Sequence, residues 1–422
     1  MKQTKFPPVK GTRDFYPEQM AFRNWLFGKM RQISERFGYQ QYEGPILESW
    51  DLYAAKSGEE LVKEQTFALT DRAGRKLALR PEMTPTLARM VAQKQGELTF
   101  PLRWYSIGPR FRYEQPQKGR GREFYQWDAD LIGSPTPEAD AEIIAIGAEF
   151  LKSLGLTPKE VVIKINNRKL MDFKLSLISI PPENRPKIFR AIDKKNKMTP
   201  QKWEEYLTSL NLKPLQIKDL KKIVTDRDYS GESEDLTATF ADLENWGVSN
   251  YVEFDASVVR GLDYYTGTVF EAQDRDGEFR TILGGGRYDN LVETVGGKPL
   301  PGVGFAAGDY VLEEVLKKYK KIPQQIPTAT TLLVTVFDEI RVSDSIKVAV
   351  QARNSGIGTE IYPDSTAKLE KQLKYANQRG LPYVAIIGPD ESAKGTAVLR
   401  NMATGKQKEV SQEKLPDEIN QA

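Results

Sequence analysis

The 422-residue chain contains neither cysteine nor histidine. The absence of cysteine excludes disulfides, a thiolate nucleophile and zinc–thiolate sites. The absence of histidine excludes a Ser-His-Asp triad and an imidazole proton relay. Chemistry in this chain must therefore use carboxylates, arginine, lysine, tyrosine, backbone dipoles and Mg²⁺. Such groups suit reactions that proceed by positioning and charge stabilisation, of which phosphoryl and nucleotidyl transfer are the main examples.

Long apolar runs are also missing. No stretch approaches the roughly 20 apolar residues that span a bilayer, and segment 1–17 has no apolar core followed by a small-residue cleavage site. We therefore expect a cytoplasmic protein with no membrane partner. Hydrophobic residues make up 39% and charged residues 28% of the chain, which is typical of a globular protein. The net charge of +3 permits a polyanionic partner without requiring one.

Hydrophobic periodicity divides the chain into domains. Helices are expected at 18–37 and 135–155, and strands at 103–113 and 122–132, with one more strand around Pro45. Lysine-rich helical stretches broken by prolines then indicate an inserted module, after which strand patterns return, among them 258–260 and 279–284. The expected segments are a first core part at 1–165, a helical insertion at 166–250, a second core part at 251–322 and an α/β unit at 327–422.

A charged hairpin is the first candidate site. Strand alternation would place Arg112 and Glu114 on one face, beside Gln126 and Asp130 of the returning strand. The connecting loop 117–122 is rich in glycine, lysine and arginine. A triphosphate cradle and a solvated hairpin with a charged tip both fit this pattern.

Two further runs carry candidate residues. In VVRGLDYYTGTVFEA, Arg260 precedes Tyr264 and Tyr265, which strand alternation would send to opposite faces. The alternative is a surface arginine with an aromatic cross-strand pair. GGGRYDNL contains neither GxGxxG nor GxxxxGK[ST], so Rossmann and P-loop sites are excluded. Glu82, in LRPEMTP, would either receive a substrate ammonium or cap a helix.

Together these runs resemble the histidyl-tRNA synthetase family of class II aminoacyl-tRNA synthetases. The likeness spans nearly the whole chain, through GTRDFYP, LRPEMTPTLARM, FRYEQPQKGRGREFYQ, INNRK, RGLDYYTGTVFE, GGGRYDNL, PGVGFAAG and KQLKYANQRGLPYVAIIG. RGLDYY and GGGRYD are the histidine-specific signatures of that family. The resemblance implies an α+β class II synthetase catalytic core, an antiparallel sheet flanked by helices, with a helical insertion that embraces tRNA and a C-terminal α/β anticodon-binding domain. It also implies a homodimer assembled partly through the Pro45 strand.

The resemblance also implies a reaction and its residues. L-histidine would be activated with ATP to histidyl-adenylate, and histidine then transferred to the 3′-terminal adenosine of tRNA(His). Mg²⁺ would accompany ATP, and no metal site of the protein's own is implied. Arg260 and Arg112 would be the catalytic cations. The histidine-binding positions would be Glu82, Thr84, Gln126, Asp130, Tyr264 and Tyr265, and the ATP-binding positions Arg112, Glu114, Arg120, Phe124 and Arg287.

The chain departs from the family pattern in three places. Class II enzymes usually carry an arginine after the last Gly-rich strand, where this chain has 309–311, DYV. Arg280 and Arg287 are the candidates to replace it. Asp130 stands where many relatives have glutamate, and Tyr125 where histidine is frequent.

Three other functions compete with a histidine-specific ligase. A non-catalytic regulatory subunit of histidine biosynthesis would share the fold, but it typically lacks the anticodon-binding domain and has an eroded arginine signature. Another class II synthetase would not carry RGLDYY and GGGRYD. A tRNA-binding protein without chemistry would not need Glu82, Gln126 and Arg260 together.

Overall fold

The structure is a computed structural model that describes residues 6–54, 65–117, 119–195, 198–228, 230–261, 264–323, 326 and 330–421. The chain forms two compact units, Met1–Pro323 and Gln324–Ala422. Lys118 of the charged loop, Leu262 and Asp263 of RGLDYY, and the linker residues 324, 325 and 327–329 lie outside the described residues.

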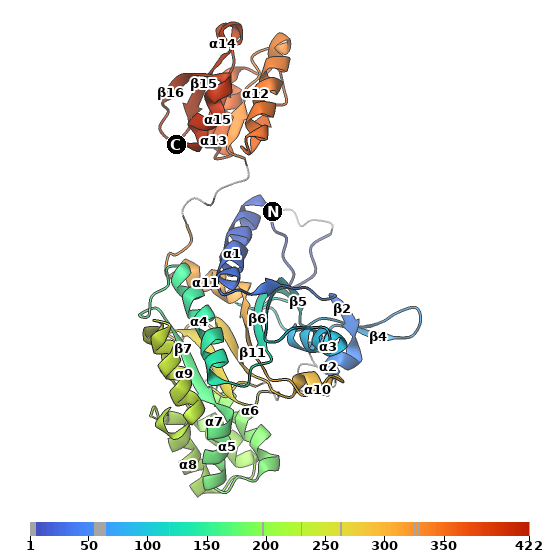
Figure 1. The fold of residues 1–422 in the computed structure, drawn as a ribbon, viewed down its shortest axis with the longest axis vertical. Coiled ribbons are helices and arrows are strands. Elements are labelled where there is room, and N and C mark those ends of the chain that lie inside the picture. Colours follow the sequence, from blue (N-terminus) through green and yellow to red (C-terminus); the bar gives the residue numbers. More distant parts are fainter. Residues whose placement is uncertain are drawn as a thin grey trace. The chain divides into compact units, whose positions relative to one another are not determined.

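The first unit is built on an eight-stranded sheet (Figure 1). The strand order is β1 (Gln40–Gln41), β5 (Leu102–Phe111), β6 (Glu123–Ile132), β11 (Gly302–Gly308), β10 (Leu283–Arg287), β9 (Thr268–Asp274), β7 (Val161–Asn167) and β8 (Val252–Phe254). The outermost pairs, β1 with β5 and β7 with β8, are parallel, and the pairs between them are antiparallel. The expected antiparallel sheet flanked by helices is confirmed.

The main core lies between this sheet and the helices α1 (Pro17–Arg36), α4 (Pro137–Ser153) and α11 (Asp309–Lys318). Helix α4 lies across β6, β11, β10 and β7 (Figure 1). Trp127 of β6 is fully buried, and its ring centroid lies 4.7 Å from Phe150 of α4 and 4.8 Å from Phe305 of β11. Leu26 and Met30, one helical turn apart in α1, close the same core, as their spacing predicts.

A smaller sheet with strand order β2 (Leu47–Ser49), β4 (Lys76–Leu79) and β3 (Ala68–Thr70) adjoins α2 (Trp50–Ala54) and α3 (Thr84–Lys94). Helix α3 packs against the short α10 (Leu291–Thr294). Their shared apolar cluster includes Met83, Leu87, Tyr265 and Tyr288. This cluster joins the β4–α3 turn to the RGLDYY and GGGRYD segments.

A set of helices stands between β7 and β8, in the segment predicted as an insertion (Figure 1). They are α5 (Arg168–Leu177), α6 (Arg185–Asp193), α7 (Pro200–Ser209), α8 (Pro214–Thr225) and α9 (Glu234–Asn245). Local capping explains where several of them begin: the Asn167 side chain accepts from the first turn of α5, Thr199 from that of α7 and Ser233 from that of α9.

The second unit has its own five-stranded sheet and its own apolar core. The order is β13 (Thr359–Ile361), β12 (Leu332–Val334), β14 (Tyr383–Ile386), β15 (Thr396–Asn401) and β16 (Gln407–Ser411). Strands β13, β12 and β14 are parallel, as the alternation with helices α12 (Val342–Asn354) and α13 (Leu369–Gln378) predicts. Helices α14 (Pro389–Lys394) and α15 (Leu415–Asn420) complete the unit.

Some strand predictions were wrong. The stretch around Pro45 is divided into β1, β2 and α2, and Pro45 lies in the loop between the two strands, since proline cannot donate to a ladder. Residues 258–260 form no strand, and β10 begins at Leu283 rather than at 279. Among the described residues, no helix is long and apolar enough to cross a membrane.

Candidate active site

The first predicted site residues gather where β4 leads into α3. Glu82 lies in this turn and is 6% exposed, and the Tyr264 hydroxyl donates to its Oε2 at 3.3 Å. Thr84, which begins α3, lies beside the same hydroxyl. Burial raises the pKa of Tyr264 well above its usual value, and the charge of Glu82 raises it further. A buried carboxylate with a hydroxyl partner is suited to receive a substrate ammonium.

Arg112 approaches the same turn from the end of β5. Its Nε donates to the Pro81 carbonyl oxygen at 3.0 Å, and its guanidinium lies over the Phe124 ring, 5.2 Å from the centroid. Burial lowers the pKa of Arg112, whereas the charges of Glu82 and Glu114 raise it. Arg112 is thus a desolvated cation between two carboxylates and beside an aromatic face.

The charged hairpin continues as a loop. Arg112 and Glu114 both follow the last residue of β5, so the prediction that strand alternation puts them on one face was wrong. Arg120 instead folds back to form an ion pair with Glu114. Loss of hydration lowers the pKa of Arg280. The charge of Arg120 lowers it further and that of Glu114 raises it, so Arg280 lies near this pair. Two arginines beside one carboxylate leave an excess of positive charge, which suits a phosphate.

Strand β6 carries a row of polar side chains on one face. Gln126, Asp128 and Asp130 alternate along it, and the sequence predicts this position for Gln126 and Asp130. Asp128 forms an ion pair with Nη2 of Arg110 at 2.6 Å. The Oε1 of Gln126 and the Oδ2 of Asp130 are buried and have no hydrogen-bond partner among the described residues. Buried polar atoms without partners are rare, so a ligand is the natural partner for both.

Asp130 occupies space that a neighbouring glycine leaves open. It faces Gly304 of β11 in the sheet register, and a Cβ at Gly304 would lie 2.1 Å from Oδ1 of Asp130. The Tyr288 hydroxyl donates a short hydrogen bond to that Oδ1. Burial raises the pKa of Asp130 to about 8. Sequence analysis did not single out Tyr288, although it lies within GGGRYD.

Three tyrosine rings surround this carboxyl group. Tyr264 lies with its ring centroid 5.0 Å from that of Tyr265 and 6.1 Å from that of Tyr288. Tyr264 and Tyr265 precede β9 and form no strand, so the prediction that they face opposite sides of a sheet was wrong. Both rings instead join the same cluster, because they lie in the turn that leads into β9.

Arg260 reaches the same face of the sheet from the segment after β8. Its Nη1 lies 3.1 Å from Oε2 of Glu271 in β9, and its Nε is buried without a hydrogen-bond partner among the described residues. Burial raises the pKa of Tyr265, whereas the neighbouring Arg260 lowers it. Glu271, which sequence analysis missed, therefore orients Arg260. Its position in an alternating strand was the available signal.

Arg287 was predicted to bind ATP, but its side chain lies in a buried network of hydrogen bonds within the protein. Its side chain is 4% exposed, and all five of its N–H donors are used within the protein. Nε and Nη2 bind Asp140 Oδ1, Nη1 binds Asp289 Oδ1, and the carbonyl oxygens of Ser134 and Thr136 take the remaining donors. The structure therefore gives Arg287 a structural role and leaves it no donor for ATP.

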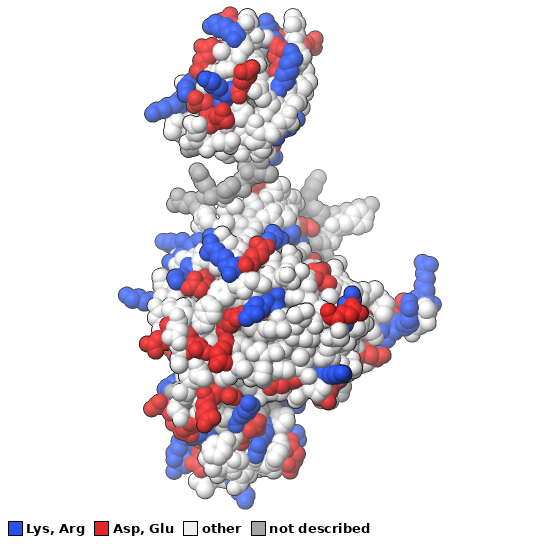
Figure 2. Space-filling model, in the orientation of Figure 1, with Lys and Arg blue, Asp and Glu red and all other residues white. Residues whose placement is uncertain are grey.

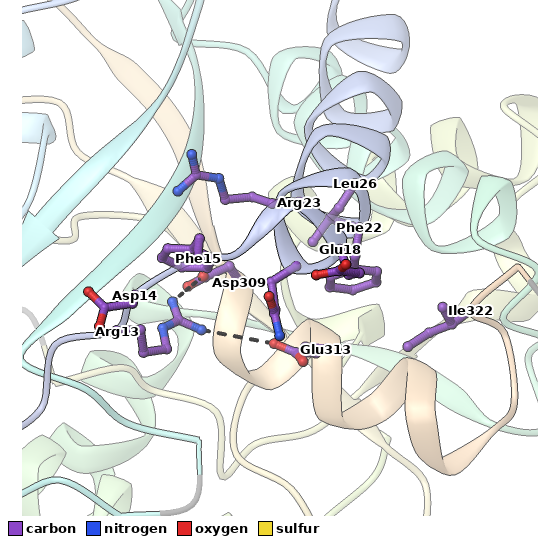
Figure 3. A pocket seen from close by; sticks show the side chains of 11 residues that line it. Arg13, Asp14, Phe15, Glu18, Phe22, Arg23, Leu26, Asp309, Glu313 and Ile322 are labelled. Atoms are coloured by element: carbon purple, nitrogen blue, oxygen red, sulfur yellow. Dashed lines mark hydrogen bonds and ion pairs between the residues drawn. The ribbon is translucent and has the colours of Figure 1, made fainter. Parts of the chain in front are cut away.

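Asp309 and Tyr310, in the segment where class II enzymes usually carry an arginine, make contacts within the protein. Asp309 accepts from the Tyr125 backbone N–H at 3.0 Å and from Nη2 of Arg13 at 2.5 Å, and the Arg13 guanidinium lies 3.5 Å from the Tyr310 ring centroid. Arg13 and Asp309 line a cavity of about 360 Å³. Figure 3 shows its lining side chains beside α1 and α11. None of the predicted site residues lines this cavity.

The described residues contain no group of three or more Asp or Glu side chains that would hold a metal ion. Glu82 and Glu114 lie beside Arg112, and Glu271 lies beside Arg260. Glu114 and Glu271 are each paired with an arginine. This donor set fits a divalent metal ion held largely by substrate phosphates, with one or two carboxylates in support.

Comparisons with known proteins agree with the motifs. A family model described as histidyl-tRNA synthetase matches residues 11–309, and one described as anticodon binding domain matches residues 332–422. The histidine–tRNA ligase of Opitutus terrae is 38% identical over 427 residues, which cover 97% of each chain. That of Leptospira biflexa is 36% identical over 421 residues, which cover 96% of each.

Two solved structures are similar over most of the chain. Histidyl-tRNA synthetase from Nostoc sp. PCC 7120 superimposes with a TM-score of 0.84 at 25% identity, covering 100% of both chains. A Bacillus halodurans protein described as an ATP phosphoribosyltransferase regulatory subunit/histidyl-tRNA synthetase has a TM-score of 0.73 at 25% identity. That match covers 89% of this chain and 97% of the other.

Proposed function

The chain belongs to the histidyl-tRNA synthetase family, and we propose from that premise how its own residues carry out the reaction. The enzyme is an aminoacyl-tRNA ligase: it activates L-histidine with ATP, releases pyrophosphate, and transfers histidine to the 3′-terminal adenosine of tRNA(His). The observation that carries the site assignment is one face of the sheet. Gln126 and Asp130 lie on that face, and Arg260 reaches it from the segment after β8. Each of these three side chains has a buried polar atom with no partner in the described part of the protein.

Histidine is recognised at both of its ends. Glu82, with Tyr264 and Thr84 beside it, receives the α-ammonium, and Gln126 binds the carboxylate end. Asp130 and Tyr265 bind the two imidazole nitrogens. Because an unpaired buried group costs about 1–3 kcal/mol, this pocket rejects side chains that lack ring nitrogens.

Two arginines supply the catalytic charge. The histidine carboxylate attacks the α-phosphorus of ATP in line, and negative charge grows on the non-bridging oxygens. Arg112 and Arg260 donate to those oxygens from a desolvated site, where a fixed cation is most effective. The attacking carboxylate is already ionised, so the step needs no side-chain base. A chain without histidine and cysteine is therefore competent for it.

The adenine and the outer phosphates are held by the hairpin after β5. Phe124 stacks on the base, Glu114 lies near it, and Arg120 binds the outer phosphates after leaving Glu114. Arg280 adds charge beside Arg120, in place of the arginine that class II enzymes usually carry where this chain has 309–311. Mg²⁺ bound to the phosphates would neutralise part of their charge, with Glu114 and Glu271 as supporting carboxylates.

tRNA binding rests on local clusters of cations. On the face that Figure 2 shows, basic and acidic side chains are interspersed. One cluster surrounds Asp255, which is 1% exposed: Lys164 Nζ lies 3.0 Å and Arg227 Nη1 2.5 Å from its Oδ2. Loss of hydration lowers the pKa of Lys195, and although Asp255 raises it, Arg227 and Lys164 lower it further. Three cations around one carboxylate suit a phosphate of the tRNA 3′ end.

We also propose a cytoplasmic homodimer that uses the segment beside Pro45. Ile46, Leu47 and Leu69 of the small sheet are 43%, 45% and 40% exposed, and Tyr113 is 54% exposed. Leu47 and Leu69 lie on the same face of this sheet, since their partners in β4 are two residues apart, and apolar side chains exposed on one face are typical of an interface. Sedimentation velocity of the purified protein tests this: a monomer at micromolar concentration would contradict it.

Histidine-dependent ATP–pyrophosphate exchange tests the proposed site, with proline, threonine and glycine as controls. We expect exchange with histidine alone, and loss of exchange in Arg260→Ala. If the folded protein exchanges with no amino acid, the regulatory-subunit alternative stands instead. The anticodon-binding unit at 332–422 and the intact Arg260 favour the enzyme.

A further inference from the structure

Arg260 has an unusual backbone conformation. Its φ is 52°, in the left-handed region, which residues other than glycine rarely adopt. Such a conformation persists only where the surrounding structure determines it. The guanidinium of Arg260 is bound by Glu271 and Tyr265, while Nε has no partner among the described residues. The groups that hold the backbone before Arg260 therefore act together with Glu271 and Tyr265 in placing its guanidinium.

The INNRK motif provides the first of these groups. Asn166 is fully buried near the end of β7, and its Nδ2 donates to two carbonyl oxygens, Ala256 at 3.1 Å and Val258 at 2.9 Å. One amide thus ties down both ends of a three-residue segment. In addition, the Asp255 N–H donates to the Ile165 carbonyl oxygen at 3.0 Å, which anchors the start of the segment to β7.

Arg168, two residues after Asn166, provides the second group that holds the backbone before Arg260. Its Nη1 donates to the carbonyl oxygen of Val259, the residue before Arg260, at 3.2 Å. Its backbone N–H donates to the Gly267 carbonyl oxygen at 2.8 Å, beyond the RGLDYY motif. The side chain is mostly buried, and its guanidinium lies over the Phe189 ring, 4.1 Å from the centroid. Phe189 belongs to α6 of the helical insertion.

We propose that Asn166 and Arg168 are positioning residues that present Arg260 to the reacting phosphate, and that α6 sets the position of Arg168. This inference rests on the proposed catalytic role of Arg260. The end of α6 contributes a further contact: Oδ2 of Asp193 lies 3.8 Å from the place of a Cβ on Gly261, and its charge acts on Arg260. Movement of the insertion on binding tRNA would therefore be transmitted to the catalytic arginine.

Arg168→Met is the primary test, because methionine keeps an apolar side chain against Phe189 and removes the donor to Val259. We expect kcat for histidine-dependent ATP–pyrophosphate exchange to fall about ten- to a hundredfold, because small misplacements of a catalytic group have effects of that size. The KM values for histidine and ATP should change little. Arg168→Lys, which keeps a donor, should recover part of the loss.

Arg185→Met is the matched control. Arg185 begins α6 and binds the Ile180 carbonyl oxygen and Asp172, all within the insertion. It should leave exchange unchanged. Equal losses in Arg168→Met and Arg185→Met would indicate a general effect on the insertion and overturn the proposal.

If Arg168→Met does not fold, Phe189→Leu is the second variant. It removes the stacking partner of Arg168 while keeping a buried apolar side chain, and the same fall in kcat is expected.

A double-mutant cycle separates this inference from the role of Arg260 itself. If Arg168 acts through Arg260, adding Arg168→Met to Arg260→Ala should reduce kcat no further. A full additional loss would overturn the positioning role. If Arg260→Ala alone retained normal exchange, the proposed function of Arg260 would fail first, and that outcome is visible in the single variant.

Discussion

The guanidinium of Arg260 lies directly over Gly284 of β10: a Cβ at Gly284 would come within 2.7 Å of Cζ of Arg260. In the sheet register Gly284 is opposite Glu271, which is the partner of Arg260. The absence of a side chain at one glycine of GGGRYD thus makes the place for the arginine of RGLDYY. The two signature motifs are joined physically at this point.

Gly284→Ala should therefore reduce activity more than stability. The added methyl group meets the flexible end of an arginine, which can move aside at small cost, but moving it displaces the proposed catalytic cation. We expect exchange activity to fall by about a hundredfold. Gly28→Ala in α1 is the control, since a Cβ there meets nothing within 4 Å. It should keep full activity and gain up to about 1 kcal/mol of stability from helix propensity. Normal exchange in Gly284→Ala would contradict the placement of Arg260.

Asp130→Asn tests the burial of the carboxyl group at the imidazole end. The folded-state pKa of Asp130 is about 8 and its ordinary value is 3.8, so the folded protein holds a proton that the unfolded chain releases. The stability that this proton provides is complete below pH 4 and is lost as pH rises to about 8. Relative to the wild type, the Asn variant should gain roughly 1.4 kcal/mol per pH unit between those limits and level off above pH 8.

Tryptophan fluorescence during urea unfolding measures the free energy of unfolding of each protein. The signal reports on the first unit, which contains Asp130, because the chain's six tryptophans all lie before residue 324. Wild type and Asp130→Asn are compared at pH 6 and pH 8. A constant difference between the two proteins would show that Asp130 is ionised throughout. Histidine activation should fall in the variant at both pH values, because an amide has one acceptor atom and the carboxyl group has two, one for the Tyr288 hydroxyl and one for the imidazole.

Periodicity was sufficient to predict the helices α1 and α4, the hairpin β5–β6 and the alternation of Gln126 and Asp130. These features depend on residues close together in the chain. Sequence analysis was wrong where distant residues decide the structure. Tyr264 and Tyr265 leave the strand pattern because both rings join a cluster with Tyr288 and α3. The INNRK motif was recognised as a pattern, but its carbonyl partners lie about 90 residues further along, and no local signal indicates them.

Arg287→Met distinguishes a structural from an ATP-binding role. Removing the arginine leaves Asp140, which is 2% exposed, without its ion-pair partner. The loss of stability should be about 3–5 kcal/mol, as is typical for breaking a buried pair. At a temperature where the variant remains folded, its KM for ATP should equal that of the wild type. An increased KM for ATP in a protein of normal stability would restore the role that the sequence suggested.

Lys195→Gln tests whether the cluster around Asp255 binds the tRNA 3′ end. Exchange needs no tRNA and should be unchanged, whereas the KM for tRNA in aminoacylation should rise severalfold. The dependence of log KM on log salt concentration should also become less steep by about one unit, because one phosphate contact is lost.

Lys218→Gln is the control, since Lys218 is an exposed lysine of α8 in the same insertion. Equal effects of the two variants would mean that only the net charge of the insertion matters. An effect of Lys195→Gln alone would place a phosphate beside Lys164, Arg227 and Asp255, on the side of the sheet from which Glu271 orients Arg260.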